Sequence, residues 1–377
     1  MTKLLKGLAL GAVALALAVP GAAGAAGAAD KVIKLGCYAP MTGPLAKYGK
    51  SMQEGFDMAI ADFAASGKLK DATFAIKCED SQGRADDGIN LARKFVDDKD
   101  VVAVLGGWAS TVTMAAAPIY DQAKLVNLTP ISSHPDVTKL SPWVFRQSII
   151  QSKEGAANAA YLQALGAKKI AIIAFPNDFG KANVGALKAL YTKAGGEVVF
   201  EEFIKPDAQD FRAILTKLQR DKPDMIYMAL FPPHASLVMK QAKQLGIDIP
   251  FFGNSALSTD DMTRLAGDAA NGLHLLLVFH PVVNKEMAEF FKRYQAKFGA
   301  APEVFAVNSY ISATMLMDVL AKQYPNITRA SVKDGLDAVR KIDSIAGPLT
   351  YDPATREWDF QFHRGMIKDG QFVLVTK

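Results

Sequence analysis

The segment at residues 101–134 constrains the fold of this chain more than any other part of its sequence. It begins with Val101–Leu105, a short apolar and β-branched run that is typical of a strand buried on both faces of a sheet. Two glycines then break the run. Apolar residues next recur at helical spacing, at Val112, Ala115, Ala116, Ile119 and Tyr120. A second buried strand is expected at Leu125–Leu128. The pattern therefore predicts a strand, a glycine turn, a helix and a further strand of one α/β sheet.

The turn and the loop of this segment carry the residue types of an anion-binding site. In an open α/β sheet, ligands bind outside the carboxyl ends of the strands. A helix N-terminus at that edge offers free N–H groups and the positive end of the helix dipole, which attract a carboxylate or a phosphate. Trp108 would add an apolar wall, and hydroxyls would come from Ser110, Thr111, Ser132 and Ser133. The alternative is that Ser110 stands at the N-cap only to cap its helix.

The N-terminus has the composition of a secretory signal peptide spanning residues 1–29. Lys3 and Lys6 form a basic region, residues 8–19 form an apolar run, and the small residues up to Ala29 offer cleavage sites. The apolar run is too short, and too rich in Ala and Gly, for the alternative of a transmembrane anchor. No later stretch is expected to be long and apolar enough to cross a bilayer. The sequence therefore predicts a protein exported to the periplasm.

Strands alternate with helices in two successive series, which predicts two α/β lobes, each built on a doubly wound parallel sheet. No linker rich in Ser or Gly separates the series, so the chain is expected to change lobe within structured segments. These segments lie near residues 145–152, 277–281 and 346–351. The predicted boundaries are 30–148 plus 280–347 for lobe 1, and 149–279 plus 348–377 for lobe 2. Several close crossings of this kind make a hinge.

The net charge and the number of cysteines limit which classes of protein this chain can belong to. The formal net charge of +5 falls to +3 when Lys3 and Lys6 leave with the signal peptide, and no basic run is present. A nucleic-acid partner is therefore not expected. The two cysteines, Cys37 and Cys78, lie near the ends of strands that would be neighbours in a doubly wound sheet. In an exported protein they either form a disulfide or remain two small buried apolar residues.

Several motifs along the chain together resemble a known family. They are the signal peptide, Pro40–Gly49, Gly106–Thr113, Asn127–Pro130, Phe145-Arg146, Asn177–Gly180 and Gly347–Asp352. With them the chain resembles the type I periplasmic binding proteins, specifically the leucine/isoleucine/valine-binding group of ABC transporter receptors, over nearly all of the mature chain. The resemblance implies two doubly wound lobes joined by three crossovers, which close on a ligand as a hinged clamp. It also implies an inner-membrane ABC permease as partner, a monomer, and no cofactor or metal.

The resemblance further implies a ligand pocket. Ser110 matches the serine at a helix N-terminus that holds the ligand carboxylate, and Ile131 and Ser133 match a pair on the next loop that also meets the ligand. The aromatic positions of the family's pocket are matched by Tyr48, Phe179 and Phe231. The implied ligand is a small molecule with a carboxylate, either a branched-chain amino acid or an aromatic or aliphatic acid.

One departure from the family pattern bears on the choice of ligand. The family's amino-acid receptors commonly place an acidic residue after the strand predicted at 250–253, where it neutralises the ligand ammonium. This chain has Asn254 and Ser255 at that place. An ammonium buried without a counter-charge costs several kcal/mol. The pocket is therefore expected to bind plain aromatic or branched aliphatic acids at least as well as the amino acids.

No catalytic motif favours an enzyme. The first strand ends in Gly36–Gly43, which lacks the G-x-G-x-x-G pattern of dinucleotide-binding proteins, and the sequence has no G-x-S-x-G, H-E-x-x-H or Walker motif. Its five histidines have no metal-like spacing. We therefore expect a non-enzymatic receptor of an ABC importer. A ligand-sensing module that docks on a membrane receptor is the alternative.

Overall fold

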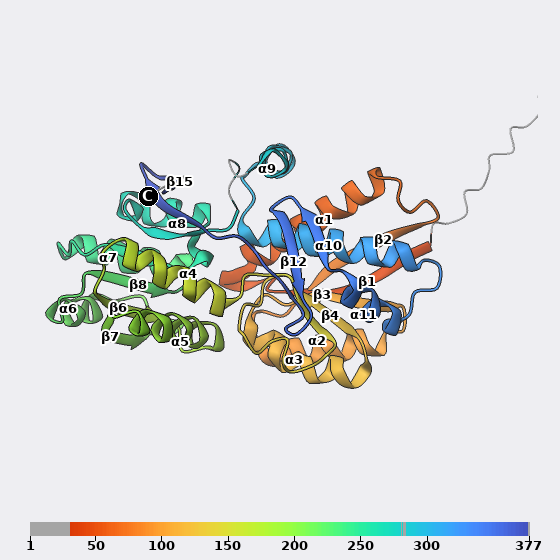
Figure 1. The fold of residues 1–377 in the computed structure, drawn as a ribbon, viewed down its shortest axis with the longest axis horizontal. Coiled ribbons are helices and arrows are strands. Elements are labelled where there is room, and N and C mark those ends of the chain that lie inside the picture. Colours follow the sequence, from red (N-terminus) through yellow and green to blue (C-terminus); the bar gives the residue numbers. More distant parts are fainter. Residues whose placement is uncertain (1–30, 280, 282–283, 376–377) are drawn as a thin grey trace, which may run out of the picture.

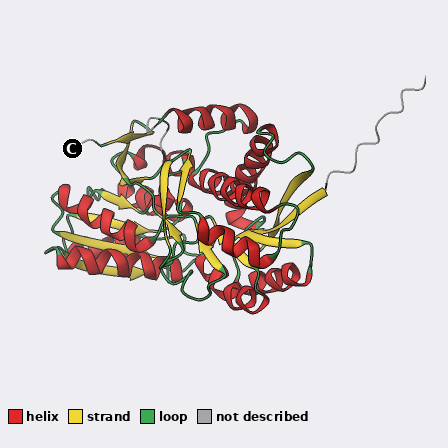
Figure 2. Cartoon of the chain, turned by 45° about the vertical axis from the view of Figure 1, so that its right-hand side comes forward, coloured by secondary structure: helices red, strands yellow, loops and turns green. Residues whose placement is uncertain are grey.

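The computed structural model describes residues 31–279, 281 and 284–375, and it has two α/β lobes that lie next to each other (Figure 1). The signal peptide predicted at residues 1–29 lies outside the described residues. Each lobe is a sheet flanked by helices, which Figure 2 shows in separate colours. The predicted architecture of two doubly wound lobes is confirmed, and each sheet additionally has antiparallel strands at one edge.

Lobe 1 is built on an eight-stranded sheet in the order β11-β12-β13-β5-β4-β3-β1-β2. Its strands are β1 (Lys31–Ala39), β2 (Ala72–Asp80), β3 (Val101–Gly106), β4 (Val126–Thr129), β5 (Val144–Arg146), β11 (Lys341–Ser344), β12 (Gly347–Asp352) and β13 (Glu357–Trp358). One face is covered by α2 (Ala85–Asp97) and α3 (Ser110–Ala123). The core on the other face is formed with α1 (Ala46–Ala65), α9 (Lys285–Phe298), α10 (Val304–Gln323) and α11 (Arg329–Ala338). The short helix η1 (Gly43–Leu45) precedes α1.

Lobe 2 is built on a seven-stranded sheet in the order β15-β14-β10-β9-β8-β6-β7. Its strands are β6 (Lys169–Ala174), β7 (Glu197–Phe203), β8 (Met225–Ala229), β9 (Phe251–Gly253), β10 (His274–Leu277), β14 (His363–Lys368) and β15 (Gln371–Leu374). One face packs on α4 (Gln151–Ala164) and α5 (Asp178–Lys193). The other face packs on α6 (Arg212–Arg220), α7 (Pro232–Gln244) and α8 (Asp260–Ala266). Two short helices, η2 (Ser255–Leu257) and η3 (Gly267–Ala270), flank α8.

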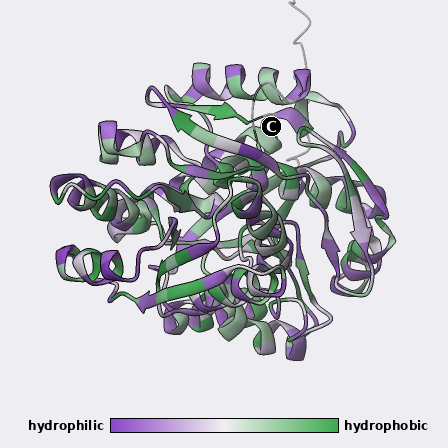
Figure 3. Cartoon of the chain, turned by 60° about the vertical axis from the view of Figure 1, so that its left-hand side comes forward, coloured by the Kyte–Doolittle hydropathy of each residue, from purple (hydrophilic) through white to green (hydrophobic). Residues whose placement is uncertain are grey.

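The central strands are apolar along their length because helices cover both faces of each sheet. All five residues of β8 are buried, and five of the six in β3 are. In Figure 3 several strands are accordingly green, whereas purple residues are frequent on the outer helices. The glycine turn after β3 lies against the Tyr38 ring, where a Cβ on Gly107 would stand only 2.4 Å from a ring carbon. Glycine is therefore required at this position for close packing.

Helix α10 corrects one expectation drawn from the sequence. Its 20 residues are long and apolar enough to cross a bilayer by length and composition. In the fold, 83% of its most apolar window is buried inside the protein. The expectation that no later stretch reaches this hydropathy was therefore wrong, because a helix in the middle of a core is apolar on nearly all of its sides.

The chain passes between the lobes three times, after β5, after β10 and after β13 (Figure 1). The third passage differs from its expected place at 346–351, because β12 and β13 still pair in the sheet of lobe 1. The rings of Tyr351 and Trp358 lie 4.6 Å apart in this core. Glu357 forms a buried ion pair with Arg146 of β5. These contacts hold residues 348–358 in lobe 1, and the chain returns to lobe 2 only at β14.

Cys37 and Cys78 stand directly opposite each other in the parallel pair of β1 and β2. They form a disulfide, with 4.3 Å between their Cα atoms. The bond links the edge strand β2 to its neighbour in lobe 1. Because the chain has only these two cysteines, lobe 2 has no disulfide of its own.

Candidate functional site

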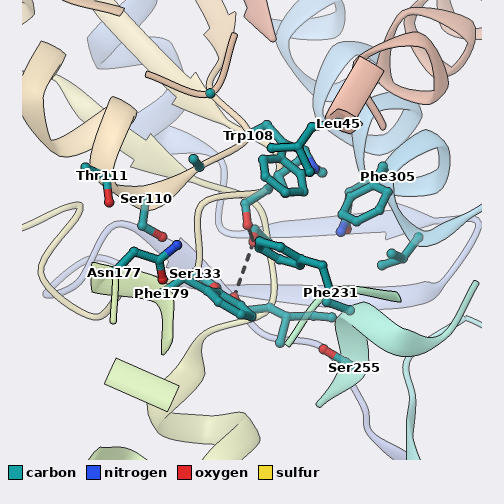
Figure 4. A pocket seen from close by; sticks show the side chains of 18 of the residues that line it. Leu45, Trp108, Ser110, Thr111, Ser133, Asn177, Phe179, Phe231, Ser255 and Phe305 are labelled. Carbon is teal, nitrogen blue, oxygen red and sulfur yellow. Dashed lines mark hydrogen bonds between the residues drawn. The ribbon is translucent and has the colours of Figure 1, made fainter. Parts of the chain in front are cut away.

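A cavity that opens to solvent lies between the two lobes (Figure 4). Eight of the eleven residues predicted to bind ligand line it, and they come from both lobes. These eight are Trp108, Ser110, Thr111, Ile131, Ser133, Phe179, Phe231 and Ser255. The other three, Tyr48, Ser132 and Asn254, are buried behind the lining residues and do not reach the cavity.

Ser110 is the first residue of α3 and not its N-cap, which corrects the prediction. Ala109 occupies the N-cap position, and no side chain caps the helix there. The Oγ atom of Ser110 instead accepts a hydrogen bond from the backbone N–H of His134, at 3.2 Å. Since the first N–H groups of a helix have no partner within it, α3 presents free donors and a positive dipole end to the cavity. This end of the cavity suits an anion.

The loop after β4 contributes Ile131 and Ser133 to the cavity but turns Ser132 away from it. The Ser132 hydroxyl lies 2.6 Å from Thr113 Oγ1 and donates to the carbonyl oxygen of Gly107 at 3.1 Å. It therefore ties the loop to the glycine turn of β3. Neighbouring hydroxyls look alike in a sequence, so the pattern alone does not separate this structural role from ligand binding.

Aromatic rings from both lobes form the apolar part of the cavity (Figure 4). The ring of Trp108 in lobe 1 lies 4.9 Å from the ring of Phe231 in lobe 2, and Phe231 lies 5.0 Å from Phe179. Tyr48 stacks behind Trp108 with ring centroids 5.4 Å apart and planes within 1° of parallel. Tyr48 therefore fixes the orientation of the indole and does not contact the ligand space itself.

The lobes also touch through polar side chains beside the cavity. Thr111 Oγ1 of α3 donates to Asp178 Oδ2 of α5 at 2.9 Å. Lys47 Nζ of α1 lies 2.9 Å from Asp261 Oδ1 of α8, and it also pairs with Glu303 of its own lobe. These contacts and the Trp108–Phe231 contact join the two lobes around the cavity.

The cavity contains a carboxyl group that the sequence-based prediction missed. Glu154, in the first turn of α4, is only 2% exposed and lines the cavity together with Ser255. The backbone N–H of Ser255 donates to Glu154 Oε1 at 2.6 Å. Burial raises the pKa of Glu154, and hydrogen bonding with Ser255 and Asn158 opposes this shift only in part.

The expectation that this pocket lacks a carboxylate was therefore wrong. The loop after β9 indeed has none, and the side-chain amide of Asn254 is used to donate to the carbonyl oxygen of Leu230 at 3.3 Å. A carboxylate reaches the same loop from α4, 101 residues earlier in the chain. Tertiary packing brings the two segments together, and spacing in the sequence does not reveal it.

Ten further lining residues were also absent from the predicted set, and Asn177, Phe305 and Asn308 are among them. Asn177 Oδ1 caps α5 by accepting from the N–H of Gly180 at 2.9 Å, and it belongs to a motif that the sequence had already singled out. The other two lie in α10, whose apolar pattern predicted only a core helix. Within the described part of the chain, no three His, Cys, Asp or Glu side chains gather where they could hold a metal ion.

Comparisons with known proteins agree with this geometry. The family model for periplasmic binding proteins matches residues 32–368. The leucine-, isoleucine-, valine-, threonine-, and alanine-binding protein of Pseudomonas aeruginosa is 27% identical over 354 residues, which cover 92% of each chain. The structure of a candidate branched-chain amino acid ABC transporter protein from Rhodospirillum rubrum is 31% identical, with a TM-score of 0.71, and the match covers 91% of this chain and 100% of that one.

A third relative differs in the ligand it holds. The solute-binding protein of an ABC transporter from Rhodopseudomonas palustris was solved with 3,4-dihydroxybenzoic acid. It is 24% identical to this chain, with a TM-score of 0.82 and coverage of 90% of this chain and 95% of that one. This likeness supports the fold. The resemblance found in the sequence is confirmed, and the chain belongs to the periplasmic binding protein family.

Proposed function

We propose that this protein is the receptor of an ABC importer. It captures one small carboxylate-bearing ligand between its lobes and releases it, chemically unchanged, to an inner-membrane permease. Membership of the family supports this function, as does the relative from Pseudomonas aeruginosa whose name states that it binds branched-chain and other small amino acids.

The observation that carries the proposal is the way the two lobes share the cavity. Lobe 1 supplies an anion-binding end at Ser110 and Ser133, and lobe 2 supplies the rings of Phe179 and Phe231 opposite it. A ligand that fills this space contacts both lobes, so it stabilises the closed arrangement relative to an open one. The rings suit the hydrocarbon part of an aliphatic or aromatic carboxylate.

We place the hinge in the three segments that join residues 31–146 and 284–358 of lobe 1 to residues 151–277 and 363–375 of lobe 2. On opening, the Thr111–Asp178 hydrogen bond and the Lys47–Asp261 ion pair would separate. Lys47 is 47% exposed, and ion pairs in contact with water contribute only about 0–1 kcal/mol. A ligand that contacts both lobes adds to these contacts and so favours the closed arrangement.

We further propose that residues 1–29 direct export and are removed, so that the mature receptor acts as a monomer in the periplasm. The basic start and the apolar run of this segment support export. The Cys37–Cys78 disulfide suits the same oxidising compartment.

Mass spectrometry of the ligand retained by protein purified from its native host tests the proposal. We expect one small carboxylate per protein, recovered unchanged after incubation. Calorimetry with a panel of amino acids and of aliphatic and aromatic acids should then show binding at a single site. Failure of every carboxylate to bind, or recovery of a chemically altered compound, would overturn the function.

A further inference from the structure

Glu154 is the only ionisable side chain among the described residues that line the cavity. Its neighbours there are apolar, aromatic, hydroxyl or amide side chains, so no lysine, arginine or histidine of the lining neutralises it. The ligand space therefore has a positive helix end in lobe 1 and one carboxyl group in lobe 2.

The other buried carboxylates of the described chain show what Glu154 lacks. Four acidic side chains are at least nine-tenths buried, and three of these have a cationic partner. Lys47 contacts Asp261 and Glu303, and Arg146 contacts Glu357. Among the ion pairs of the described residues, none involves Glu154. A buried carboxylate without a counter-charge either takes up a proton or gains a cationic partner, and a ligand in the cavity can supply that partner.

A purely structural role for Glu154 explains only a small part of this arrangement. The residue lies in the first turn of α4, where the helix dipole favours a negative charge, and it accepts a hydrogen bond from the Ser255 N–H. The dipole interaction is weak compared with the cost of removing a carboxylate from water. A glutamine at this position would accept the same hydrogen bond without that cost. Stability of the fold therefore does not explain why this residue is a glutamate.

A different polar group in the cavity, the side-chain oxygen of Asn308, lacks a hydrogen-bond donor. Asn308 lines the same space, and its Oδ1 atom is buried without a hydrogen-bond partner among the described residues. Unsatisfied buried acceptors are rare in folded proteins. Together with Glu154, this acceptor indicates that the ligand brings hydrogen-bond donors as well as an anionic group.

We propose that Glu154 receives the positively charged group of the ligand, which is an α-amino acid with an apolar side chain. This inference rests on the proposed function and names the ligand class of the same cavity. The ligand carboxylate lies at the start of α3, its ammonium lies at Glu154, and its side chain lies among Trp108, Phe179 and Phe231. The assignment reverses the preference for plain acids that the loop at Asn254 and Ser255 had indicated.

Matched ligand pairs test the inference on the unmodified protein. L-leucine and 4-methylpentanoate differ only by the α-amino group, as do L-phenylalanine and 3-phenylpropanoate. Calorimetry at neutral pH should show that at least one amino acid binds about 100-fold more tightly than its deaminated partner, as expected for a buried charge pair. Equal or tighter binding of the plain acids would overturn the inference while leaving the proposed carboxylate receptor intact. If neither member of either pair binds, the inference fails for an apolar amino acid, and the wider panel of carboxylates then decides whether the proposed function holds.

The variant Glu154→Gln attributes the preference to this side chain. We expect the amino acid to lose about 100-fold in affinity, while the plain acid binds as before or more tightly because a repelling charge is gone. Asp62→Asn is the matched control, because Asp62 pairs with Arg293 in lobe 1 and does not line the cavity. This control should keep the wild-type preference. Equal losses for both ligands in Glu154→Gln would show that Glu154 only shapes the site. The unmodified protein still decides the ligand class if the variant does not fold.

Discussion

The two walls of the cavity differ in how their polar groups are built and satisfied. On the side of lobe 1, β3, its glycine turn and α3 follow one another in the chain, so Ser110 and Thr111 reach the cavity through local structure. On the side of lobe 2, Glu154 meets Ser255 only because α4 packs near the end of β9. In the first wall, the Oδ1 atom of Asn308 has no hydrogen-bond partner among the described residues, but no charged side chain of the described residues lines it. The second wall keeps a buried carboxylate that has no cation of its own.

This difference suggests that the two sides of the cavity have different functions. On the proposed function, the wall of lobe 1 would provide an anion site that any small carboxylate can use, and the wall of lobe 2 would decide which carboxylates bind. Substitutions of buried polar groups should therefore lower stability in lobe 1, whereas removing the unpaired charge in lobe 2 should raise stability and impair selectivity.

The largest expected effect comes from breaking the buried ion pair of lobe 1. Glu357→Gln leaves the Arg146 guanidinium buried without its carboxylate, which typically costs about 3–5 kcal/mol of unfolding free energy. Urea unfolding measures the loss. A change below about 1 kcal/mol would show that the carbonyl oxygens of Ser132 and His134, which Arg146 also contacts, suffice to hold the guanidinium.

The disulfide of lobe 1 should give the next largest effect. Replacing both Cys37 and Cys78 by alanine opens a loop with a sequence separation of 41 residues, and such links typically stabilise a fold by about 2–4 kcal/mol. Calorimetry of the variant measures the loss. Thiol titration of the unfolded, unreduced wild-type protein should find no free thiol, and two free thiols would contradict the bond.

Much of the fold could be predicted from the sequence because its signals are local. The apolar run of β3, the glycine turn and the helical spacing of α3 lie within one segment, which brings Trp108, Ser110 and Thr111 to the cavity. The third crossing was misplaced because β13 joins lobe 1 through distant partners, Arg146 among them. Ser132 and Asn254 were chosen by position in a loop, but hydrogen bonds to the carbonyl groups of Gly107 and Leu230 use their side chains elsewhere.

Glu154 shows why the chemistry of lobe 2 was harder to predict. A glutamate in the first turn of a helix is an ordinary finding, since it favours the helix dipole. Only the packing of α4 against the loop of Ser255 buries it and turns it toward the cavity. The same holds for Asn308, which the sequence places in a core helix.

The variant Ser110→Ala tests whether the lobe 1 side of the cavity binds the ligand carboxylate. Loss of the hydroxyl should weaken binding by about 1–3 kcal/mol, as expected for a hydrogen bond to a charged group. The fold should lose only about 1 kcal/mol of stability, because the Ser110 hydroxyl accepts one hydrogen bond, from the His134 N–H, and does not cap the helix. Calorimetry measures the affinity. Ser132→Ala is the control, and it should reduce stability while affecting affinity less. A larger loss of affinity in Ser132→Ala than in Ser110→Ala would contradict the proposed position of the ligand carboxylate.

The smallest expected effect is a gain in stability from Glu154→Gln in the empty protein, of about 1 kcal/mol at neutral pH. Burial raises the pKa of Glu154 in the folded state. The wild-type protein therefore loses stability as the pH rises above the unfolded pKa of about 4.3 and toward the folded pKa. The glutamine variant lacks this loss, so its advantage should grow with pH and disappear near pH 4. A variant that is less stable than wild type at pH 7 would contradict an unpaired charge.

The central claim is that both lobes close on one ligand. Small-angle scattering tests it most directly, with the protein measured alone and with saturating L-leucine, once calorimetry has shown that L-leucine binds. If the two lobes move about the three crossings, the loaded protein should have a smaller radius of gyration than the empty one. The scattering of the loaded protein should also match that calculated for the closed structure with its Thr111–Asp178 contact. Identical curves at full occupancy would contradict capture by closure.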